Sequence, residues 1–257
     1  YDQVLLEHKV VPIKVRSLVG LLPLIAVSVI EEEQLERLPG FRKRFEWFLA
    51  NRKDLARCII QSRSGKKRWL ISAVPFARLQ RILSRLLDPD EFLSPYGIRS
   101  LSKYHEKHPF TVDFKGHVQS VSYAPGESQT LSFGGNSNWR GPIWFPINYL
   151  IIEALDRYYN FYGESLKIEY PTGSGNELTL KECANDIRKR LVRLFKSDEN
   201  GLYPWQDGDT RYNEIASDQP RHQFFEYFNP ETGKGHGANH QTGWTALVAT
   251  LIQQSYE

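Results

Sequence analysis

The sequence predicts an all-α protein. Apolar residues recur at helical spacing in about six segments, and one of these segments opens with a complete helix-capping signal. Alternating strand–helix units are absent, which argues against a doubly wound sheet. The chain has 257 residues, of which 40% are hydrophobic, and this is enough apolar material for a real core.

The first half of the chain contains three expected helices. Residues 17–38 are predicted to form one buried helix, because they are apolar nearly all round, with a kink at Pro23 and a stop at Pro39. Residues 41–51 form a second helix with one aromatic and apolar face. Residues 75–87 form a third, with leucine and isoleucine at helical spacing.

Residues 88–138 differ from the rest, because they are rich in Pro, Gly and Ser. We expect a long structured excursion there, with short strands within residues 111–122. Long excursions from compact domains often carry function.

The second half returns to helices. Pro142 suits the first position of a helix that ends at Gly163. The next helix opens at Thr179, which is predicted to cap it while the Glu182 side chain reaches back. A final helix follows Thr242.

Charge and composition restrict the function. The net charge is only +3, and the short basic runs lie among acidic residues or on expected helix faces, so we expect no nucleic-acid partner. The two cysteines match no metal-ligand or disulfide spacing, and no apolar run reaches membrane-spanning length. We therefore expect a cytoplasmic protein with no cofactor, no metal and no membrane partner.

Three connections place aromatic residues beside charged or amide residues just before a helix. They are Leu93-Ser-Pro-Tyr-Gly-Ile-Arg-Ser-Leu101, Asn136-Ser-Asn-Trp-Arg-Gly-Pro-Ile-Trp144, and Phe224-Phe-Glu-Tyr-Phe-Asn-Pro-Glu-Thr-Gly-Lys-Gly235 followed by His240-Gln-Thr-Gly-Trp-Thr245. Sugar sites need this mixture, because ring faces stack on aromatic groups and hydroxyls need polar partners. The same residues would also be explained by buried tryptophans at a helix start and by a Glu226 that reaches solvent from an amphipathic strand.

These segments resemble glycoside hydrolase family 63, which includes the processing α-glucosidases. The resemblance rests on Asn138-Trp-Arg-Gly-Pro-Ile-Trp144 with Asn148-Tyr-Leu150, on Phe225-Glu-Tyr, on Asn-Pro-x-Thr-Gly-x-Gly, and on Thr242-Gly-Trp-Thr-x-Leu-Val248. Tyr1-Asp2 with Lys14-Val-Arg-Ser-Leu-Val-Gly-Leu-Leu-Pro23 is closest to the little-characterised bacterial members. The resemblance covers nearly the whole chain.

The resemblance implies an (α/α)6 barrel and an inverting hydrolase acting on α-glycosidic bonds of oligosaccharides or small α-glucosides. Such a barrel needs twelve helices, so residues 1–257 would be the C-terminal portion of one catalytic domain. The start at Tyr1 rather than Met fits that expectation. By the same resemblance Glu226 is the general base, and the acid is an Asp upstream of this chain.

Further site residues are expected from the same three connections. Trp139, Trp144 and Trp244 are candidate stacking walls for a sugar, and Arg140 would bind substrate hydroxyls or orient Glu226. Tyr96 and Arg99 would reach the rim or brace their loop, and His240 would support the site or cap a helix. Asp2, Asp207 and Asp209 are local alternatives for the acid, and we expect them instead to be turn, loop or rim residues.

Two other readings stay open. One is a hydrolase of mannosylglycerate or trehalose on the same barrel. The other is a sugar-binding or scaffold domain that keeps a cleft without chemistry. The sequence does not indicate the exact glycan or the oligomeric state.

Overall fold

The computed structural model describes residues 2–6, 8–62, 65–127, 140–211 and 222–255. Its helices are α1 (Glu32–Arg37), α2 (Pro39–Asn51), α3 (Phe76–Leu86), α4 (Phe145–Tyr162), α5 (Leu180–Arg193), α7 (Thr242–Thr245) and α8 (Val248–Gln254). Its strands are β1 (Asp2–Leu6), β2 (Lys9–Ile13), β3 (Val27–Glu31), β4 (Ile59–Gln61), β5 (Arg68–Ser72), β6 (Leu93–Ser94), β7 (Gly97–Ile98), β8 (Phe110–Phe114), β9 (His117–Val121), β10 (Lys167–Glu169), β11 (Glu177–Thr179), β12 (Tyr227–Phe228) and β13 (Gly235–His236).

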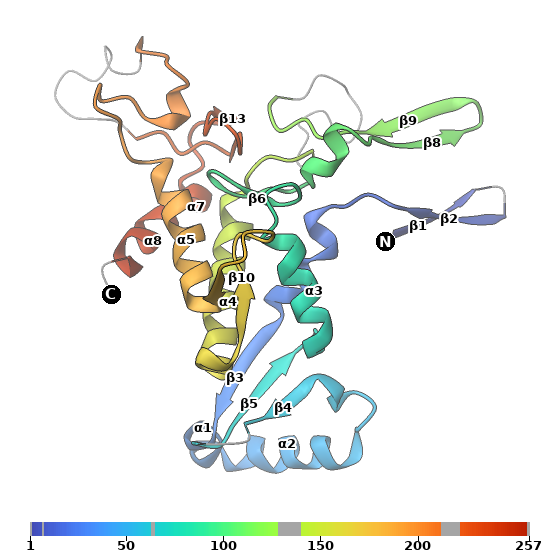
Figure 1. Cartoon of the computed structure of the whole chain (residues 1–257). Helices are drawn as coiled ribbons and strands as arrows, with labels where there is room; N and C mark the ends of the chain where they lie inside the picture. The colour runs from blue at the N-terminus through green and yellow to red at the C-terminus, as the bar shows by residue number, and fades with distance from the viewer. Residues whose placement is uncertain (1, 7, 63–64, 128–139, 212–221, 256–257) are drawn as a thin grey trace.

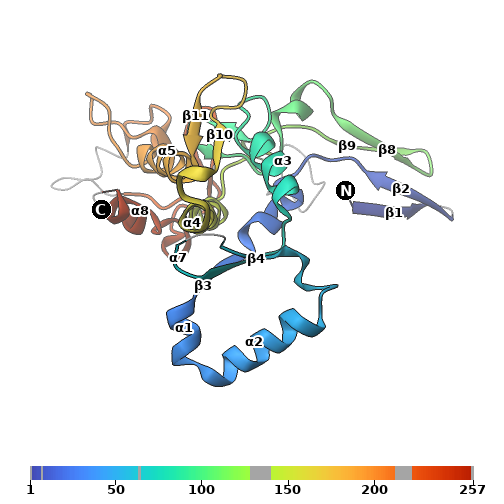
Figure 2. The ribbon, with the colours of Figure 1, turned by 60° about the horizontal axis from the view of Figure 1, so that its bottom comes forward.

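The molecule is mixed α and β, so the expected all-α fold, which the family resemblance specified as part of an (α/α)6 barrel, is wrong. Six small antiparallel sheets occur among the described residues, five of them simple two-stranded hairpins. The sixth has the order β3-β5-β4 and lies below α3, α4 and α5, with α1 and α2 across its end (Figures 1 and 2).

The single helix expected over residues 17–38 is also wrong. Two short 3-10 turns, Leu18–Gly20 and Leu22–Ile25, precede strand β3 and helix α1. β3 is rich in β-branched residues and pairs with β5 from Val27 opposite Ser72 to Glu31 opposite Arg68. An apolar run that is buried on both sides looks the same in a strand and in a helix, and the distant partner β5 decides between them.

The other expected elements are largely confirmed, although the helix expected to begin at Pro142 begins at Phe145. α2 and α3 lie where helices were predicted, although Pro39 begins α2 rather than only ending its predecessor. Thr179 and Glu182 form the predicted capping box at α5. Strands β8 and β9 occupy the excursion, joined by a turn in which Lys115 and Gly116 both have positive φ. The last helix is divided into α7 and α8.

One large core holds the helices together. α5 packs along α4, and α3 completes the same cluster through Leu79, Leu83 and Leu86. The Tyr158 hydroxyl on α4 lies 2.8 Å from that of Ser72 on β5, both buried, which joins helix to sheet. A smaller core of Leu35, Phe45 and Trp69 sits between the sheet and α1–α2.

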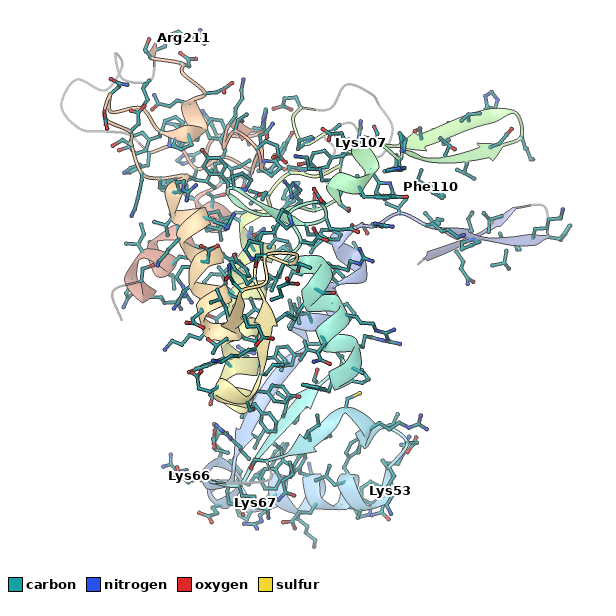
Figure 3. All side chains as sticks on the ribbon, in the orientation of Figure 1. Lys53, Lys66, Lys67, Lys107, Phe110 and Arg211 are labelled. Atoms are coloured by element: carbon teal, nitrogen blue, oxygen red, sulfur yellow. The ribbon has the colours of Figure 1, made fainter. Side chains whose placement is uncertain are left out.

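The basic runs at residues 42–44 and 66–68 lie at the surface, as expected, whereas Arg188 of the run at residues 188–190 is buried and pairs with Asp156 at 2.9 Å. Lys66 and Lys67 stand beside α1 (Figure 3), where they pair with Glu33 at 2.9 Å and Glu32 at 3.7 Å. Arg42 on α2 pairs with Glu32 at 3.0 Å. Opposite charges therefore interleave at this end of the molecule.

Candidate functional site

The hairpin β12–β13 carries Glu226 and is shaped by its own turn. Tyr227 pairs with His236 and Phe228 with Gly235. Asn229 closes the connecting turn, because its side-chain oxygen accepts the Glu231 N–H at 2.9 Å and its carbonyl accepts the Gly233 N–H at 2.8 Å. The motif Asn-Pro-x-Thr-Gly therefore has a structural role in this turn, whether or not it also contributes to a site.

The three connections singled out in the sequence meet here. Ile143 and Phe228 exchange two backbone hydrogen bonds of 2.8 and 3.1 Å, and Ile143 also bridges Arg99 on its other side. This short ladder brings the entrance of α4 against the Glu226 hairpin. Segments 85 residues apart are thus adjacent.

Aromatic rings gather beside this ladder. Trp144, directly before α4, lies 5.2 Å from the Tyr227 ring and 5.6 Å from the Trp244 ring, measured between centroids. Tyr227 in turn stacks on His236 at 5.8 Å. Trp144 and Tyr227 are buried, whereas Trp244 is 36% exposed and forms the open edge of the group.

Glu226 is half-buried at the start of this hairpin. Its N–H donates to the Ala238 carbonyl at 2.8 Å, and its Oε2 is 3.4 Å from the Ala238 nitrogen. Phe225 before it is buried against Gly235, where an added Cβ would lie 2.2 Å from the ring. The backbone that carries the Glu226 carboxylate is therefore held by the hydrogen bond to Ala238 and by the packing of Phe225 on Gly235.

A second carboxylate, Glu127, reaches the same hairpin and was missed in the sequence. It accepts the Tyr227 hydroxyl at 3.0 Å and the Gly237 N–H at 3.0 Å, and its Oε1 is 3.4 Å from His236 Nδ1. No local motif marks it. The only signal was its position within the long excursion.

These contacts shift the pKa values of the group. Partial burial would raise the pKa of Glu127, but the Gly237 N–H, the Tyr227 hydroxyl and His236 together outweigh it and lower that pKa. Burial lowers the pKa of His236 despite its acidic neighbour. Burial and then the Glu127 hydrogen bond raise the pKa of Tyr227. At neutral pH the Glu127 carboxylate is therefore ionised, and the Tyr227 hydroxyl and the His236 imidazole beside it are neutral.

Arg140 and Arg99 are both buried, and they stand in different settings. The Arg140 carbonyl accepts the Ala124 N–H at 2.7 Å, which ties this segment to the excursion. Arg99 is 2% exposed, and its guanidinium bonds Glu231 at 2.8 Å and Tyr123 at 3.0 Å. Of the two alternatives for Arg99, the structure favours bracing over a place at the rim.

The remaining candidates divide similarly. Tyr96 is half-buried with its ring close to Gly233, so it also braces the turn. His240 is exposed and pairs through its backbone with Phe224. Asp207 pairs with Lys234 at 3.0 Å, and Asp209 pairs with Arg211, as suits surface loop residues. Trp139 and the side chain of Asp2 lie outside the described residues.

Among the described residues, no group of three or more His, Cys, Asp or Glu residues could hold a metal ion. None of the helices described is long and apolar enough to cross a bilayer.

Comparison with known proteins identifies the class. Residues 62–245 match the family described as mannosylglycerate hydrolase MGH1-like glycoside hydrolase domain. The chain belongs to this family of glycoside hydrolases, which confirms the resemblance to family 63.

Its relatives include yeast proteins. An uncharacterized protein of Saccharomyces cerevisiae is 51% identical over 96% of the chain. Two others are 28% identical: the mannosyl-oligosaccharide glucosidase of Saccharomyces cerevisiae over 71% of the chain, and a probable mannosyl-oligosaccharide glucosidase of Schizosaccharomyces pombe over 70%. The chain spans only 23%, 17% and 16% of the lengths of these three relatives.

Proposed function

We propose that this chain supplies the general base of an inverting hydrolase that cleaves α-glycosidic bonds, and that Glu226 is that base. The observation that carries the proposal is the place of Glu226. It is a half-buried carboxylate on a fixed hairpin, directly before Tyr227, which packs on Trp144. Such a carboxylate is shielded from bulk water yet near an apolar wall suited to a sugar ring.

The proposed reaction joins a water oxygen to the anomeric carbon while the bond to the leaving oxygen breaks. Glu226 takes a proton from that water. A carboxylic acid on the opposite side of the ring gives a proton to the leaving oxygen, about 6.5–9.5 Å away in inverting enzymes. We assign the acid to an Asp in the longer protein, of which this chain would be one portion of a single catalytic domain.

The neighbouring residues have supporting roles in this proposal. Trp144 and Trp244 would form the wall on which the sugar stacks, and Arg140 would orient Glu226 or bind a substrate hydroxyl. Trp139 is assigned to the same wall from its motif. Tyr96, Arg99 and His240 are left to hold the loops, in keeping with their observed contacts.

Two substrate classes are supported by the relatives. The names of the 28% identical proteins favour a glucose-capped oligosaccharide, whereas the family description favours mannosylglycerate. Assaying the full-length protein on α-glucosyl oligosaccharides, mannosylglycerate and trehalose separates them. Turnover of none of these would favour the non-catalytic sugar-binding reading.

The decisive variant is Glu226→Gln in the full-length protein. Glutamine keeps the shape but cannot take a proton from water, so kcat should fall by about a hundred- to ten-thousand-fold while sugar binding and folding persist. Proton NMR of the first product should show the β anomer in the parent enzyme.

Glu177→Gln is the matched control. Glu177 is an exposed residue on the β10–β11 hairpin, and its replacement should leave turnover unchanged. An α anomer as first product, or near-normal turnover of Glu226→Gln, would reject Glu226 as the base. If Glu226→Gln lowered stability, sugar binding and turnover together, Glu226 would have a structural role in a packed segment and not a catalytic one.

A further inference from the structure

The segment that leads to Glu127 is anchored close to the site. The Tyr123 N–H donates to the His105 carbonyl at 3.3 Å, and the Ala124 N–H donates to the Arg140 carbonyl at 2.7 Å. The Tyr123 hydroxyl also bonds Glu231 at 2.8 Å. Glu127 therefore follows, within three residues, a backbone already tied to the Trp-Arg-Gly segment and to the turn of the hairpin.

The carboxylate of Glu127 bonds a residue on each side of the β12–β13 hairpin. One of its oxygens accepts from Tyr227, the residue after Glu226, and the other accepts from Gly237, the residue after β13. The Glu226 N–H donates to the carbonyl of Ala238, the residue after Gly237. Glu127 and Glu226 thus bond two consecutive residues of the segment that follows β13.

We propose that Glu127 is a positioning residue, which clamps Tyr227 and Gly237 so that the Glu226 carboxylate keeps its direction toward the attacking water. This inference rests on the proposed function of Glu226. The clamp acts through hydrogen bonds and not through packing, because the Glu127 side chain is 56% exposed. Glu127 touches no reacting atom in this proposal.

The clamp requires an ionised carboxylate. A carboxylate accepts hydrogen bonds on both oxygens, whereas an amide accepts on one and donates from the other end. Tyr227 and Gly237 both offer donors. Glutamine at position 127 can keep both contacts only if the Tyr227 hydroxyl turns to accept from the amide, and neither hydrogen bond is then charge-assisted.

The test is a double-mutant cycle in the full-length protein with Glu127→Gln and Tyr227→Phe. Glu127→Gln weakens the Glu127–Tyr227 contact by removing its charge, and Tyr227→Phe removes it, so each should lower kcat by roughly ten- to hundred-fold, as small misplacements of reacting groups do. The KM and the β configuration of the product should stay nearly unchanged. The double variant should lose little more than either single variant, because the shared contact is already gone.

The controls separate this proposal from the one on which it rests. Glu177→Gln should behave as the parent enzyme. If Glu226→Gln is inactive while Glu127→Gln keeps parental kcat, the clamp fails and the base stands. If Glu226→Gln retains turnover, the proposed function fails, whatever Glu127 does.

Three further outcomes would overturn the clamp itself. One is strictly additive losses in the double variant. Another is a Glu127→Gln protein whose melting temperature and sugar affinity fall with kcat, since that indicates a structural role. The third is an unchanged kcat in Tyr227→Phe. This variant removes only a hydroxyl, so it tests the proposal even if Glu127→Gln does not fold.

Discussion

Gly237 shows how closely the backbone of the site approaches its side chains. Its φ is +70°, and a Cβ there would lie 2.6 Å from Glu226 Oε2 and 2.9 Å from the Tyr227 ring. Both distances are shorter than real Cβ contacts. A side chain at this position must displace the proposed base or its aromatic neighbour.

We expect Gly237→Ala to lower kcat about ten-fold or more, because it pushes the carboxylate out of line. The matched control is Gly201→Ala, with φ +75° and nothing within 4 Å of the added Cβ. Both variants bear the left-handed strain of about 1–2 kcal/mol, and only the first bears the collision. Equal effects of the two on kcat and on the free energy of unfolding would contradict this account.

At the scale of elements, the start of α5 offers a local test. The Thr179 side chain accepts the Glu182 N–H at 3.3 Å, and the Glu182 carboxylate accepts the Thr179 N–H at 2.8 Å. Since α5 packs along α4, this cap also supports the helix that enters the site. Thr179→Ala should cost about 1 kcal/mol of unfolding free energy, measured by chemical denaturation.

Thr179→Ser is the control for that prediction, because it keeps the capping oxygen. It should retain most of the stability of the parent protein. A loss in Thr179→Ser equal to that in Thr179→Ala would mean that the buried methyl group, and not the cap, carries the effect.

The sequence could predict features that depend on residues close together in the chain, and it could not predict those that depend on distant partners. The cap at Thr179 and the apolar face of α3 depend on neighbouring residues, and both lie where the local pattern predicts them. Strand β3 was taken for helix because its identity depends on β5, about 40 residues later in the chain. The all-α expectation failed partly for this reason, and partly because the hairpins β1–β2, β6–β7 and β10–β11 were not predicted.

The same distinction applies to the site. Glu226 and Trp144 could be singled out because their segments resemble motifs of glycoside hydrolase family 63, and these segments are adjacent in the structure. Glu127 could not be found, since its partners are 100 and 110 residues away and its local sequence has no catalytic pattern. The bracing contacts of Arg99 are equally long-range, with Glu231 132 residues away.

At the scale of the whole molecule, Arg99 and Glu231 join distant parts of the chain. The buried guanidinium of Arg99 also bonds the Pro89 carbonyl, and Lys103 lies 3.5 Å from Glu231. Burial would raise the pKa of Glu231, but the Tyr123 hydroxyl, Arg99 and Lys103 outweigh it and lower that pKa. Because this pKa is lower in the folded state, the pair stabilises the fold above the unfolded pKa of about 4.3, and the stabilisation is lost as pH falls through the folded value.

We therefore expect Glu231→Gln to lower the free energy of unfolding by about 2 kcal/mol at pH 7, the scale of a hydrogen bond to a charged group. The difference from the parent protein should shrink as the pH falls below about 4.3. Denaturation curves at several pH values measure this. Glu164→Gln, in an exposed pair with Lys167, should change stability by less than about 0.5 kcal/mol throughout. A Glu231 effect independent of pH would contradict the ionic account.

The proximity of Trp144 and Trp244 has a spectroscopic consequence. Two indole rings 5.6 Å apart are close enough for their electronic transitions to couple, and Tyr227 adjoins the pair. One of these indoles comes from the start of α4 and the other from α7, so the coupling exists only when both ends of the chain's second half are in place. Near-ultraviolet circular dichroism and tryptophan emission thus report on the assembly of this corner, and Trp244, at the open edge, makes the same signal sensitive to whatever stacks against it.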